Sequence, residues 1–485
     1  MVPGLLLLVL VREQLRACAF WYDMPLQKGW SRVGMAHLKN IGGLPETAWQ
    51  TPAGLRWFAL IGLLAYAALR FLWPEVGEGG GTLMGLLGLV AALTWGKGVR
   101  GSGPLWLLLA AVVVQLVSWT GGYFHHPEWI SDNPQLDRLA KLFLFIGVAW
   151  WLGGNTRFTW LAWGLGALGV ILVMLPPFTA WSVWQRGLLG SRVNLSIQNA
   201  QHDSMLLGTV LLGLVATSGR LLGAGPWRLV RLISWLLGIA VCLAGVMVTQ
   251  TRATWLGLLL ALSLAGLCWA VYERVTGHPR AARRMFALLG SLALLIVLGG
   301  SYFHESIERR LGQERQVMEQ IIAGNLEQVP DSSIGVRIHS WRAAGEWIAE
   351  RPLVGWGGQA RGLVMDHTEW LPPIYKERYG HLHNSFLEIW VAYGLLGVGL
   401  FVALAAWMGI GTWKAWRAGV MPGDMALFGT AFFVFWMVVN QFESFMGFGS
   451  GVYVFNMVMG GLVTHIWRWQ VESGQRVFPF FRKEA

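Results

Sequence analysis

Long apolar stretches recur along almost the whole chain, and they limit its possible folds more than any other feature. Of its 485 residues, 55% are hydrophobic and only 13% are charged, which is about half the charged content of an average soluble domain. A chain of this composition needs lipid as the solvent for most of its length. Because the hydrocarbon core offers no water to unpaired backbone groups, the spanning segments must be helical. The sequence therefore predicts an all-α, polytopic membrane protein.

The apolar stretches predict about 12 transmembrane helices, although several are shorter than the roughly 20 residues of a perpendicular span. Proline and glycine cluster in the connections, as at Pro176-Pro177 and Pro422-Gly423, where turns are expected. The predicted segments are residues 55–73, 82–96, 104–121, 139–153, 157–177, 204–218, 229–249, 253–272, 284–303, 384–410, 424–440 and 451–467.

Lysine and arginine are distributed unevenly among the loops, and this asymmetry predicts the orientation of the chain. If the first helix starts in the cytoplasm, the short outer loops carry only Arg186, Arg192 and Arg252. Basic residues mark cytoplasmic loops, so the outer side is the face of the membrane away from the cytoplasm. The net charge of +11 has the same origin and does not indicate nucleic-acid binding. The basic residues of the predicted inner loops and tail are Lys97, Arg100, Arg157, Arg220, Arg228, Arg231, Arg274, Arg280, Arg283, Arg284, Lys414, Arg417, Arg468, Arg476, Arg482 and Lys483.

The connections divide the chain into predicted regions. Residues 1–50 form a cytoplasmic N-terminal extension, residues 51–303 carry helices one to nine, and residues 383–467 carry the last three helices. Residues 304–382 mix acidic and basic residues, and their apolar residues have helical spacing, which predicts a large, mainly helical loop on the outer side. Residues 468–485 form a cytoplasmic tail. Long loops in compact proteins are usually functional, so the search for a site begins at this loop.

Three arginines on the predicted outer side stand out because the orientation does not require them. Arg252 lies between two apolar segments with almost no loop, Arg192 lies in an outer loop, and Arg337 lies on the packed side of a predicted helix. An arginine near lipid is costly and usually has an anionic partner. Its planar, permanently charged fork fits phosphate oxygens. The alternative is a structural ion pair with a carboxylate such as Asp203 or Glu443.

Two histidines and an asparagine stand where the large loop re-enters the membrane. His381, His383 and Asn384 end the loop, and Glu388 follows one helical turn later. Histidine is the usual proton acceptor near neutral pH, so His383 is a candidate general base. Two histidines at this spacing do not make a strong metal site without a third ligand, and we predict no metal. The alternative is an interfacial histidine bonded to loop backbone.

Motifs that indicate other chemistry are absent from the sequence. It has no Asp-x-Asp pair for a nucleotide-sugar metal ion and no phosphate-binding glycine loop with Lys and Ser/Thr, which argues against ATP-driven work. It has no Gly-x-Ser-x-Gly elbow. Its polar groups gather at outer helix ends rather than at mid-membrane depth, which argues against a channel or transporter. We predict no cofactor.

Three segments, in this order, resemble blocks of the O-antigen ligase and O-antigen polymerase family. They are TQTRATWLG around Arg252, RIHSWRAAGEWIAERPLVGWG from Arg337 and HLHNSFLEIWVAYGLLG from His381. Members of this family share the blocks, about a dozen helices and a large periplasmic loop late in the chain. The resemblance covers roughly residues 55–467, and its specific part lies at about residues 190–400.

The resemblance implies a glycosyltransferase of the Gram-negative inner membrane. An O-antigen ligase transfers a glycan from undecaprenyl diphosphate to a sugar hydroxyl of the lipid A core in lipopolysaccharide biosynthesis. The family's arginine before an apolar helix corresponds to Arg252, its loop arginine to Arg337 and its histidine before Asn to His383, and Arg192 is a looser match. The implied partners are the undecaprenyl-diphosphate-linked O-antigen, the lipid A core and membrane lipids.

The residue types support the same chemistry on physical grounds. A diphosphate leaving group needs charge stabilisation, which Arg252 with Arg192 or Arg337 can supply without a metal. The acceptor hydroxyl needs a base, and His383 is the best placed; a single displacement then inverts the anomeric carbon. The predicted catalytic residues are His383, Arg252 and Arg337. The predicted substrate-binding residues are Arg192, His381, Asn384, His202, Arg138 and Lys141.

Other functions share part of this pattern. An O-antigen polymerase has the same donor and differs in its acceptor, and a protein O-oligosaccharyltransferase is a further possibility in the same enzyme class. A transporter or flippase for a lipid-linked sugar is the alternative from a different class. Such a transporter is expected to place polar groups at mid-membrane depth in several helices.

Overall fold

The structure, a computed structural model, describes residues 49–223, 225, 227–275, 290, 319, 320, 322, 323, 329 and 332–478. The chain divides into one compact unit of residues 47–265 and 288–485 and a smaller unit of residues 1–46 and 266–287. Only the end of one helix is described in the smaller unit, so the account below concerns the larger unit. Nearly all of the predicted N-terminal extension, the ninth apolar segment except Gly290, and most of residues 304–331 lie outside the described residues.

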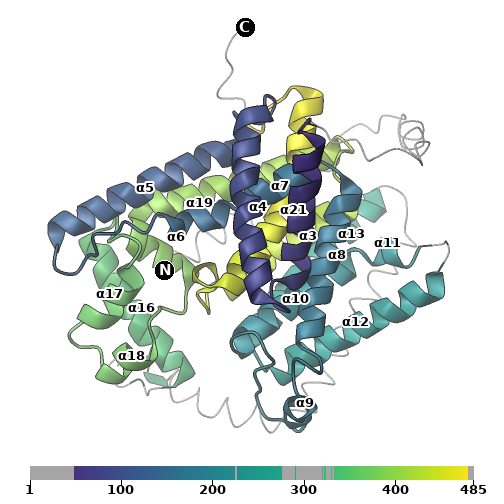
Figure 1. Ribbon diagram of the computed structural model, residues 1–485. Coiled ribbons are helices and arrows are strands. Elements are labelled where there is room, and N and C mark those ends of the chain that lie inside the picture. The colour runs from purple at the N-terminus through teal and green to yellow at the C-terminus, as the bar shows by residue number, and fades with distance from the viewer. Residues whose placement is uncertain are drawn as a thin grey trace. The chain divides into compact units, whose positions relative to one another are not determined.

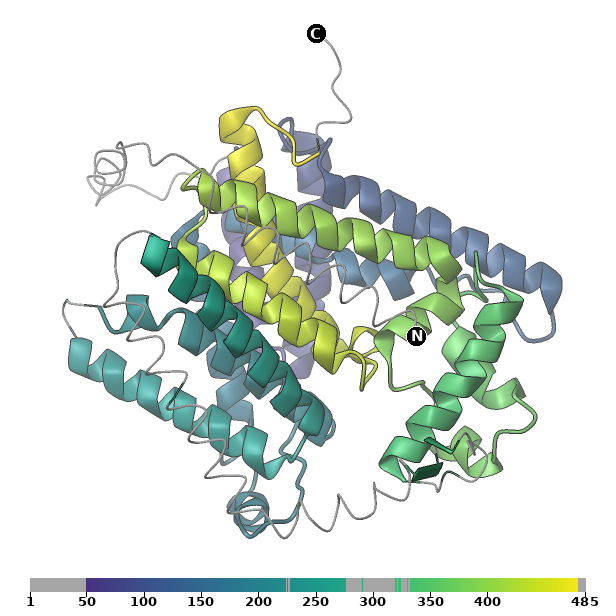
Figure 2. The ribbon, with the colours of Figure 1, turned by 180° about the vertical axis from the view of Figure 1, so that it is seen from behind.

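Every element in the described part of the chain is a helix, in agreement with the predicted all-α class (Figure 1, Figure 2). The helices are α3 (Ala53–Leu69), α4 (Pro74–Trp95), α5 (Gly103–His125), α6 (Asp137–Ala140), η2 (Lys141–Phe143), α7 (Phe145–Leu152), α8 (Thr156–Val173), α9 (Trp181–Leu188), α10 (Ala200–Ala216), α11 (Ser218–Leu221), α12 (Arg228–Val248), α13 (Arg252–Val275), α16 (Ser333–Glu350), α17 (Ala360–His367), α18 (Pro373–Arg378), α19 (Ser385–Arg417), α20 (Gly423–Val439), η4 (Phe445–Gly447) and α21 (Gly449–Ser473).

Six of these helices, α4, α5, α8, α12, α13 and α19, are long and apolar enough to cross a membrane. Helices α3, α10 and α20 are also apolar but shorter. Large apolar side chains remain exposed on several of them, for example Trp106 and Leu109 on α5 and Leu237 on α12. An apolar surface of this extent is unusual for a protein in water. These helices are therefore those of a multi-pass membrane protein, with lipid against the exposed faces.

The predicted segment 139–153 is not one helix, because η2 and α7 break it into short pieces. All residues of α7 are buried, so protein rather than lipid surrounds the break. The Asn456 side chain of α21 accepts a hydrogen bond from Phe145 N (2.7 Å) and donates one to Lys141 O (2.9 Å). Irregular backbone is tolerated at membrane depth where protein satisfies its polar groups. Lys141 is the first residue of η2, the short helix before α7, and so lies at the break rather than within a continuous span.

Helix α19 is kinked at Gly394, whose backbone is left-handed (φ 60°). The segment of residues 352–357 fills the kink, and Trp356 N donates to Val391 O (3.0 Å). A Cβ atom at residue 394 would lie only 2.2 Å from the carbonyl carbon of Leu353, so glycine is required for both the conformation and the close approach. The motifs RPLVGWG and VAYGLLG thus form one joint that attaches the segment after α16 to α19.

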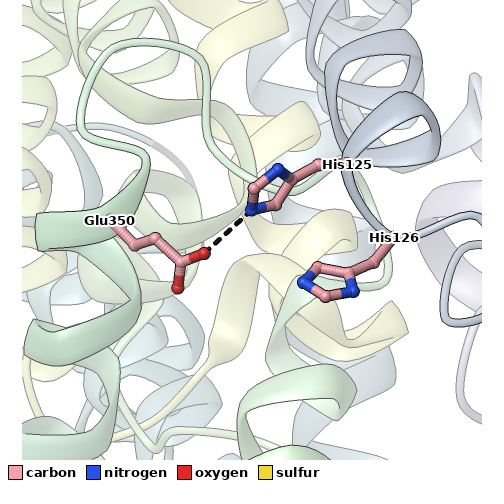
Figure 3. A group of neighbouring side chains, drawn as sticks. All are labelled: His125, His126 and Glu350. Carbon is pink, nitrogen blue, oxygen red and sulfur yellow. Dashed lines mark hydrogen bonds and ion pairs between the residues drawn. The ribbon is translucent and has the colours of Figure 1, made fainter.

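Polar contacts also join the end of α16 to the end of α5. His125 Nε2 lies 2.9 Å from Glu350 Oε1, and Arg351 Nη1 donates to Gly121 O (2.6 Å). Figure 3 shows the His125 ring and the Glu350 carboxylate pointing at one another, with His126 beside them. Helices α16, α17 and α18 lie together near the end of α5 and the start of α19 (Figure 1, Figure 2). This junction fixes the helix that carries the predicted loop arginine.

Candidate active site

A buried carboxylate in the turn between α20 and η4 holds the two predicted histidines. Only 2% of the Glu443 side chain is exposed. Its Oε1 lies 2.9 Å from His381 Nε2, and its Oε2 lies 3.4 Å from His383 Nδ1. The centroids of the two imidazole rings are 4.0 Å apart. We call Glu443, His381 and His383 the His–Glu cluster; its carboxylate comes from 60 residues after His383.

The charges in the His–Glu cluster favour a neutral His383 beside an ionised Glu443. Burial lowers the pKa of His383, and the hydrogen bond and negative charge of Glu443 oppose this in part. Burial raises the pKa of Glu443, but hydrogen bonds from His381 and His383 outweigh it and hold that pKa below its usual range. An imidazole whose Nδ1 faces a carboxylate presents Nε2 as its basic nitrogen. His383 can accept a proton there, and Glu443 can stabilise the resulting imidazolium.

The backbone around His383 is fixed from several directions. His383 has a left-handed backbone (φ 51°), which is uncommon for a residue other than glycine and is typical of strained functional sites. Asn384 caps α19, since its side chain accepts from the backbone N–H groups two and three residues later. Leu382 N donates to Glu388 Oε1 (3.0 Å), and Trp341 Nε1 donates to Leu382 O (3.0 Å). Contacts from α16 and α19 thus hold Leu382 and Asn384, the residues on either side of His383.

Arg337 approaches the His–Glu cluster from α16. Its Nε donates to Phe442 O (3.2 Å), and its Nη2 donates to Gln201 Oε1 (3.2 Å). Gln201 Nε2 in turn donates to Glu443 Oε2 (2.6 Å). Burial lowers the pKa of Arg337, the charge of Glu443 raises it, and the charge of Arg252 lowers it. Because a guanidinium stays protonated at any relevant pH, Arg337 is a fixed cation beside the candidate base.

Arg252 follows the turn between α12 and α13, and Arg192, in the loop between α9 and α10, contacts this turn. Arg252 is the exposed first residue of α13, and its charge acts on Arg337. Arg192 Nε donates to Thr249 O in this turn (3.3 Å). Gln250, next to Thr249 in this turn, has a left-handed backbone (φ 48°), and it is a second strained residue near the site. We call Arg192, Arg252 and Arg337 the arginine group.

His202 and Asp203, at the start of α10, are both fully buried. His202 Nδ1 lies 2.5 Å from Ser450 Oγ, and the Phe448 ring packs edge-on against the imidazole. Asp203 accepts hydrogen bonds from backbone N–H groups of the loop before α10. The structure therefore places Asp203 as a support for its own loop, and it gives His202 no exposed surface.

Arg138 and Lys141 line a pocket that also borders Glu388 of α19. Arg361 of α17 lines the same pocket, and its Nη1 lies 3.6 Å from Glu388 Oε2. We call Arg138, Lys141 and Arg361 the basic pocket. The remaining lining residues are Leu139, Leu142, Gly358, Ser385, Glu388, Ile389, Ala392, Tyr393, Met446 and Gly447.

A comparison with known families covers the centre of this site. Residues 237–402 match a family model described as O-antigen ligase. This match supports membership in the O-antigen ligase family. The matched span contains Arg252, Arg337 and both loop histidines, whereas Arg192 and Glu443 lie outside it. No curated protein shows significant similarity to the chain.

Three residues around the O-antigen ligase blocks were not among the predicted site residues. Glu443 is the carboxylate of the His–Glu cluster, and Gln201 donates a hydrogen bond to it. Arg361 is the third cation of the basic pocket. A carboxylate in the short connection between two apolar segments is itself a signal, because ionisable groups there are usually functional. That signal would have identified Glu443. Gln201 and Arg361 stand in no distinctive pattern.

Among the residues that the structure describes, two groups of side chains have the types that bind metal ions, and in each the ligand atoms lie within 4.8 Å of one another. In the His–Glu cluster, the carboxylate and both imidazoles already satisfy one another by hydrogen bonds, which suits proton transfer by the chain's own residues. Metal independence stays a prediction. The groups are His381, His383 and Glu443 at the site, and His125, His126 and Glu350 between α5 and α16 (Figure 3).

Proposed function

We propose that the chain is an O-antigen ligase, which transfers a glycan from undecaprenyl diphosphate to a sugar hydroxyl of the lipid A core. The observation that carries this proposal is a neutral imidazole, His383, held by an ionised carboxylate beside a group of permanent cations. The match to the O-antigen ligase model supports the same family of activities. The multiple apolar helices support access to two lipid substrates from the bilayer.

His383 acts as the general base toward the acceptor. Its Nε2 takes the proton of the acceptor hydroxyl as the hydroxyl oxygen attacks the anomeric carbon of the donor glycan. Glu443, bonded to Nδ1, stabilises the imidazolium that forms. His381 shares the same carboxylate, and Asn384 fixes the start of α19, so both act by positioning. The buried His202 takes a supporting position behind Phe448 rather than a direct place against substrate.

The arginine group acts on the leaving group. As the new glycosidic bond forms, the bond from the anomeric carbon to the diphosphate oxygen breaks, and negative charge grows on undecaprenyl diphosphate. Arg252 and Arg337 stabilise this charge, with Arg192 at the edge of the same turn, and fixed donors of this kind favour the transition state most. Attack from the face opposite the diphosphate is one displacement, so the product has inverted anomeric configuration.

Orientation follows from the distribution of basic residues. The proposed site contains residues of the predicted outer loops, and the predicted inner loops carry most of the lysine and arginine. The proposal therefore places the reaction at the periplasmic face of the inner membrane of a Gram-negative bacterium. Cysteine labelling of single substitutions at exposed positions such as Arg186 and Arg157 tests this orientation, because the two should react from opposite sides.

The deciding experiment mixes the purified full-length chain with lipid-linked O-polysaccharide and lipid A–core, without added metal or nucleotide. Ligation is expected to give lipopolysaccharide carrying the O-polysaccharide ladder. His367→Ala, an exposed histidine at the end of α17, serves as the matched control for His383→Ala. A chain that leaves lipid A–core unmodified under conditions in which both lipids bind would overturn the proposal.

An O-antigen polymerase is the second candidate, because the family match covers ligases and polymerases alike. A polymerase uses the same base and the same arginine group, and its acceptor is another lipid-linked glycan. The same assay separates the two: longer polymer still attached to undecaprenyl diphosphate indicates the polymerase. Transport of a labelled donor that persists in His383→Ala would instead indicate a transporter.

A further inference from the structure

The basic pocket is a second cationic site, separate from the arginine group. Its cations come from two parts of the chain, Arg138 and Lys141 from α6 and η2 and Arg361 from α17. Among the lining residues, the only carboxylate is Glu388. With three cations and one carboxylate, the lining residues have an excess of two positive charges, and the nearest further carboxylate, Asp137 of α6, acts on Lys141 from outside the lining. This excess is the feature that calls for a bound anion.

One carboxylate oxygen of Glu388 is already engaged in two hydrogen bonds. Its Oε1 accepts hydrogen bonds from Leu382 N (3.0 Å) and Ser444 Oγ (2.6 Å). Its Oε2 lies 3.6 Å from Arg361 Nη1, which is beyond hydrogen-bonding distance. That buried Nη1 atom has no hydrogen-bond partner among the described residues. Within the part of the chain that the structure describes, the Nη1 group of Arg361 is therefore a donor without an acceptor.

The chemistry of the pocket selects for a phosphate group. Cations in a partly buried site near lipid are costly unless an anion joins them. Guanidinium groups donate two parallel hydrogen bonds to phosphate oxygens, and a lysine adds a compact positive charge. A phosphate monoester carries close to two negative charges at neutral pH, which equals the excess on the lining. Tyr393, Gly358 and Gly447 line the pocket together with the three cations.

A continuous chain of polar contacts connects the basic pocket to the arginine group through the His–Glu cluster. Gln201 bonds both Arg337 and Glu443. Ser444 N donates to Glu443 Oε1 (2.9 Å), and Ser444 Oγ donates to Glu388 Oε1 (2.6 Å). We call this series the polar chain; its members in order are Arg337, Gln201, Glu443, Ser444, Glu388 and Arg361. The candidate base thus lies between two cationic sites.

We propose that the basic pocket binds a phosphate monoester group of the acceptor glycolipid and so positions the acceptor hydroxyl at His383. The inference rests on the proposed glycan transfer, in which the arginine group takes the diphosphate of the donor. The remaining anion in the reaction belongs to the acceptor, and the pocket is the remaining cationic site on the polar chain. Loop residues that hold the base, Leu382 and Ser444, also bond the pocket's carboxylate.

The test compares acceptor that keeps its phosphates with acceptor treated with phosphatase, using the purified full-length chain. For the phosphorylated acceptor, Arg361→Gln is expected to raise KM about tenfold, the loss expected for one charged hydrogen-bonding partner, with kcat and donor KM little changed. For the dephosphorylated acceptor, the wild-type chain already has the raised KM, and the substitution adds nothing. An equal loss with both acceptors overturns the proposal. So does a change confined to donor KM, which would assign the pocket to the donor diphosphate.

A second variant covers the case in which Arg361→Gln misfolds because Glu388 loses its neighbouring cation. Lys141→Gln removes a pocket charge that has no ion pair among the described residues, and it is expected to show the same dependence on acceptor phosphate. Arg378→Gln, exposed on α18 and outside the pocket, is the matched control and is expected to leave both KM values unchanged. Equal KM values for Lys141→Gln and wild type would overturn the proposal.

A binding measurement separates failure of this inference from failure of the proposed function. Lipid A–core is titrated against the chain in nanodiscs, with no donor present, and its affinity is expected to fall about tenfold on phosphatase treatment or with Lys141→Gln. This result supports the pocket even if no ligation occurs. Competition by inorganic phosphate at millimolar concentration agrees with the proposal. Displacement of lipid A–core by raising the fraction of phosphatidylglycerol in the disc would assign the pocket to bulk lipid and overturn it.

Discussion

The arginine group and the basic pocket lie at opposite ends of one polar chain, yet they differ in what satisfies their cations. In the arginine group, Arg337 donates to a backbone carbonyl and to Gln201, and Arg192 donates to Thr249 O. In the basic pocket, Arg361 meets a carboxylate that is bonded elsewhere. The hydrogen bonds of the arginine group fix its cations near the base, whereas the basic pocket has more cations than carboxylates. We infer that the first stabilises a transition state and the second binds a ground-state anion.

The strongest test of this difference removes the base between the two sites. His383→Ala is expected to lower kcat by about 100- to 10,000-fold, the usual contribution of a general base. Binding of donor and acceptor should be almost unchanged, because neither cationic site is touched. Rates and equilibrium affinities measured on the same preparation check both halves of this expectation. His367→Ala is expected to behave as wild type; a His383→Ala chain with wild-type turnover would remove the base assignment.

The next largest effect concerns the geometry of the arginine group. Arg337→Lys keeps the charge but loses the planar guanidinium, which donates hydrogen bonds to both Phe442 O and Gln201 Oε1. A fall in kcat of roughly tenfold to a hundredfold is expected, below the loss for removing a fixed transition-state donor outright. Acceptor KM should not move. If the same substitution raised acceptor KM and spared kcat, the two cationic sites would not have the distinct roles inferred from their bonding.

The pH dependence reports on the carboxylate that both sites share. Burial lowers the pKa of His383 and Glu443 offsets this only in part, so the acid limb of kcat/KM should lie below the ordinary histidine value of about 6.5. Glu443→Gln removes an interaction that favours the imidazolium. The acid limb should therefore move to lower pH, while the plateau rate falls about tenfold as with other lost orienting partners. A limb that moved to higher pH would contradict the assignment of His383 as the titrating group.

The sequence predicted those parts of the fold that depend on residues close together in the chain. Apolar runs identified these helices, and the predicted segments 253–272 and 384–410 begin within one residue of α13 and α19. The break before α7 and the kink at Gly394 were not predicted. Both depend on distant partners, Asn456 for the break and residues 352–357 for the kink. No local pattern in the broken segment specifies such a partner.

The same division applies to the site. The HLHN motif identified the two histidines, because imidazole is the side chain best suited to accept a proton near neutral pH. It could not identify the carboxylate they share, since Glu443 reaches them only when the turn after α20 packs against the start of α19. Arg138 and Lys141 were predicted as substrate-binding residues, but the sequence did not indicate the site that they form. Only the structure shows that these two residues line one pocket together with Arg361 of α17.

The smallest effect expected comes from cutting the polar chain at Ser444. Ser444→Ala removes the hydrogen bond to Glu388 Oε1 and leaves the backbone bond to Glu443 in place. One neutral donor to a carboxylate contributes about 1.5 kcal/mol, which is roughly a tenfold limit, and relaxation of Glu388 should reduce the effect to a few-fold in kcat/KM. The informative quantity is the double-mutant cycle with Arg361→Gln. If the two sites act through a shared network, the combined loss differs from the sum of the single losses. Strict additivity would mean that the basic pocket contributes affinity alone and that the base is positioned without it.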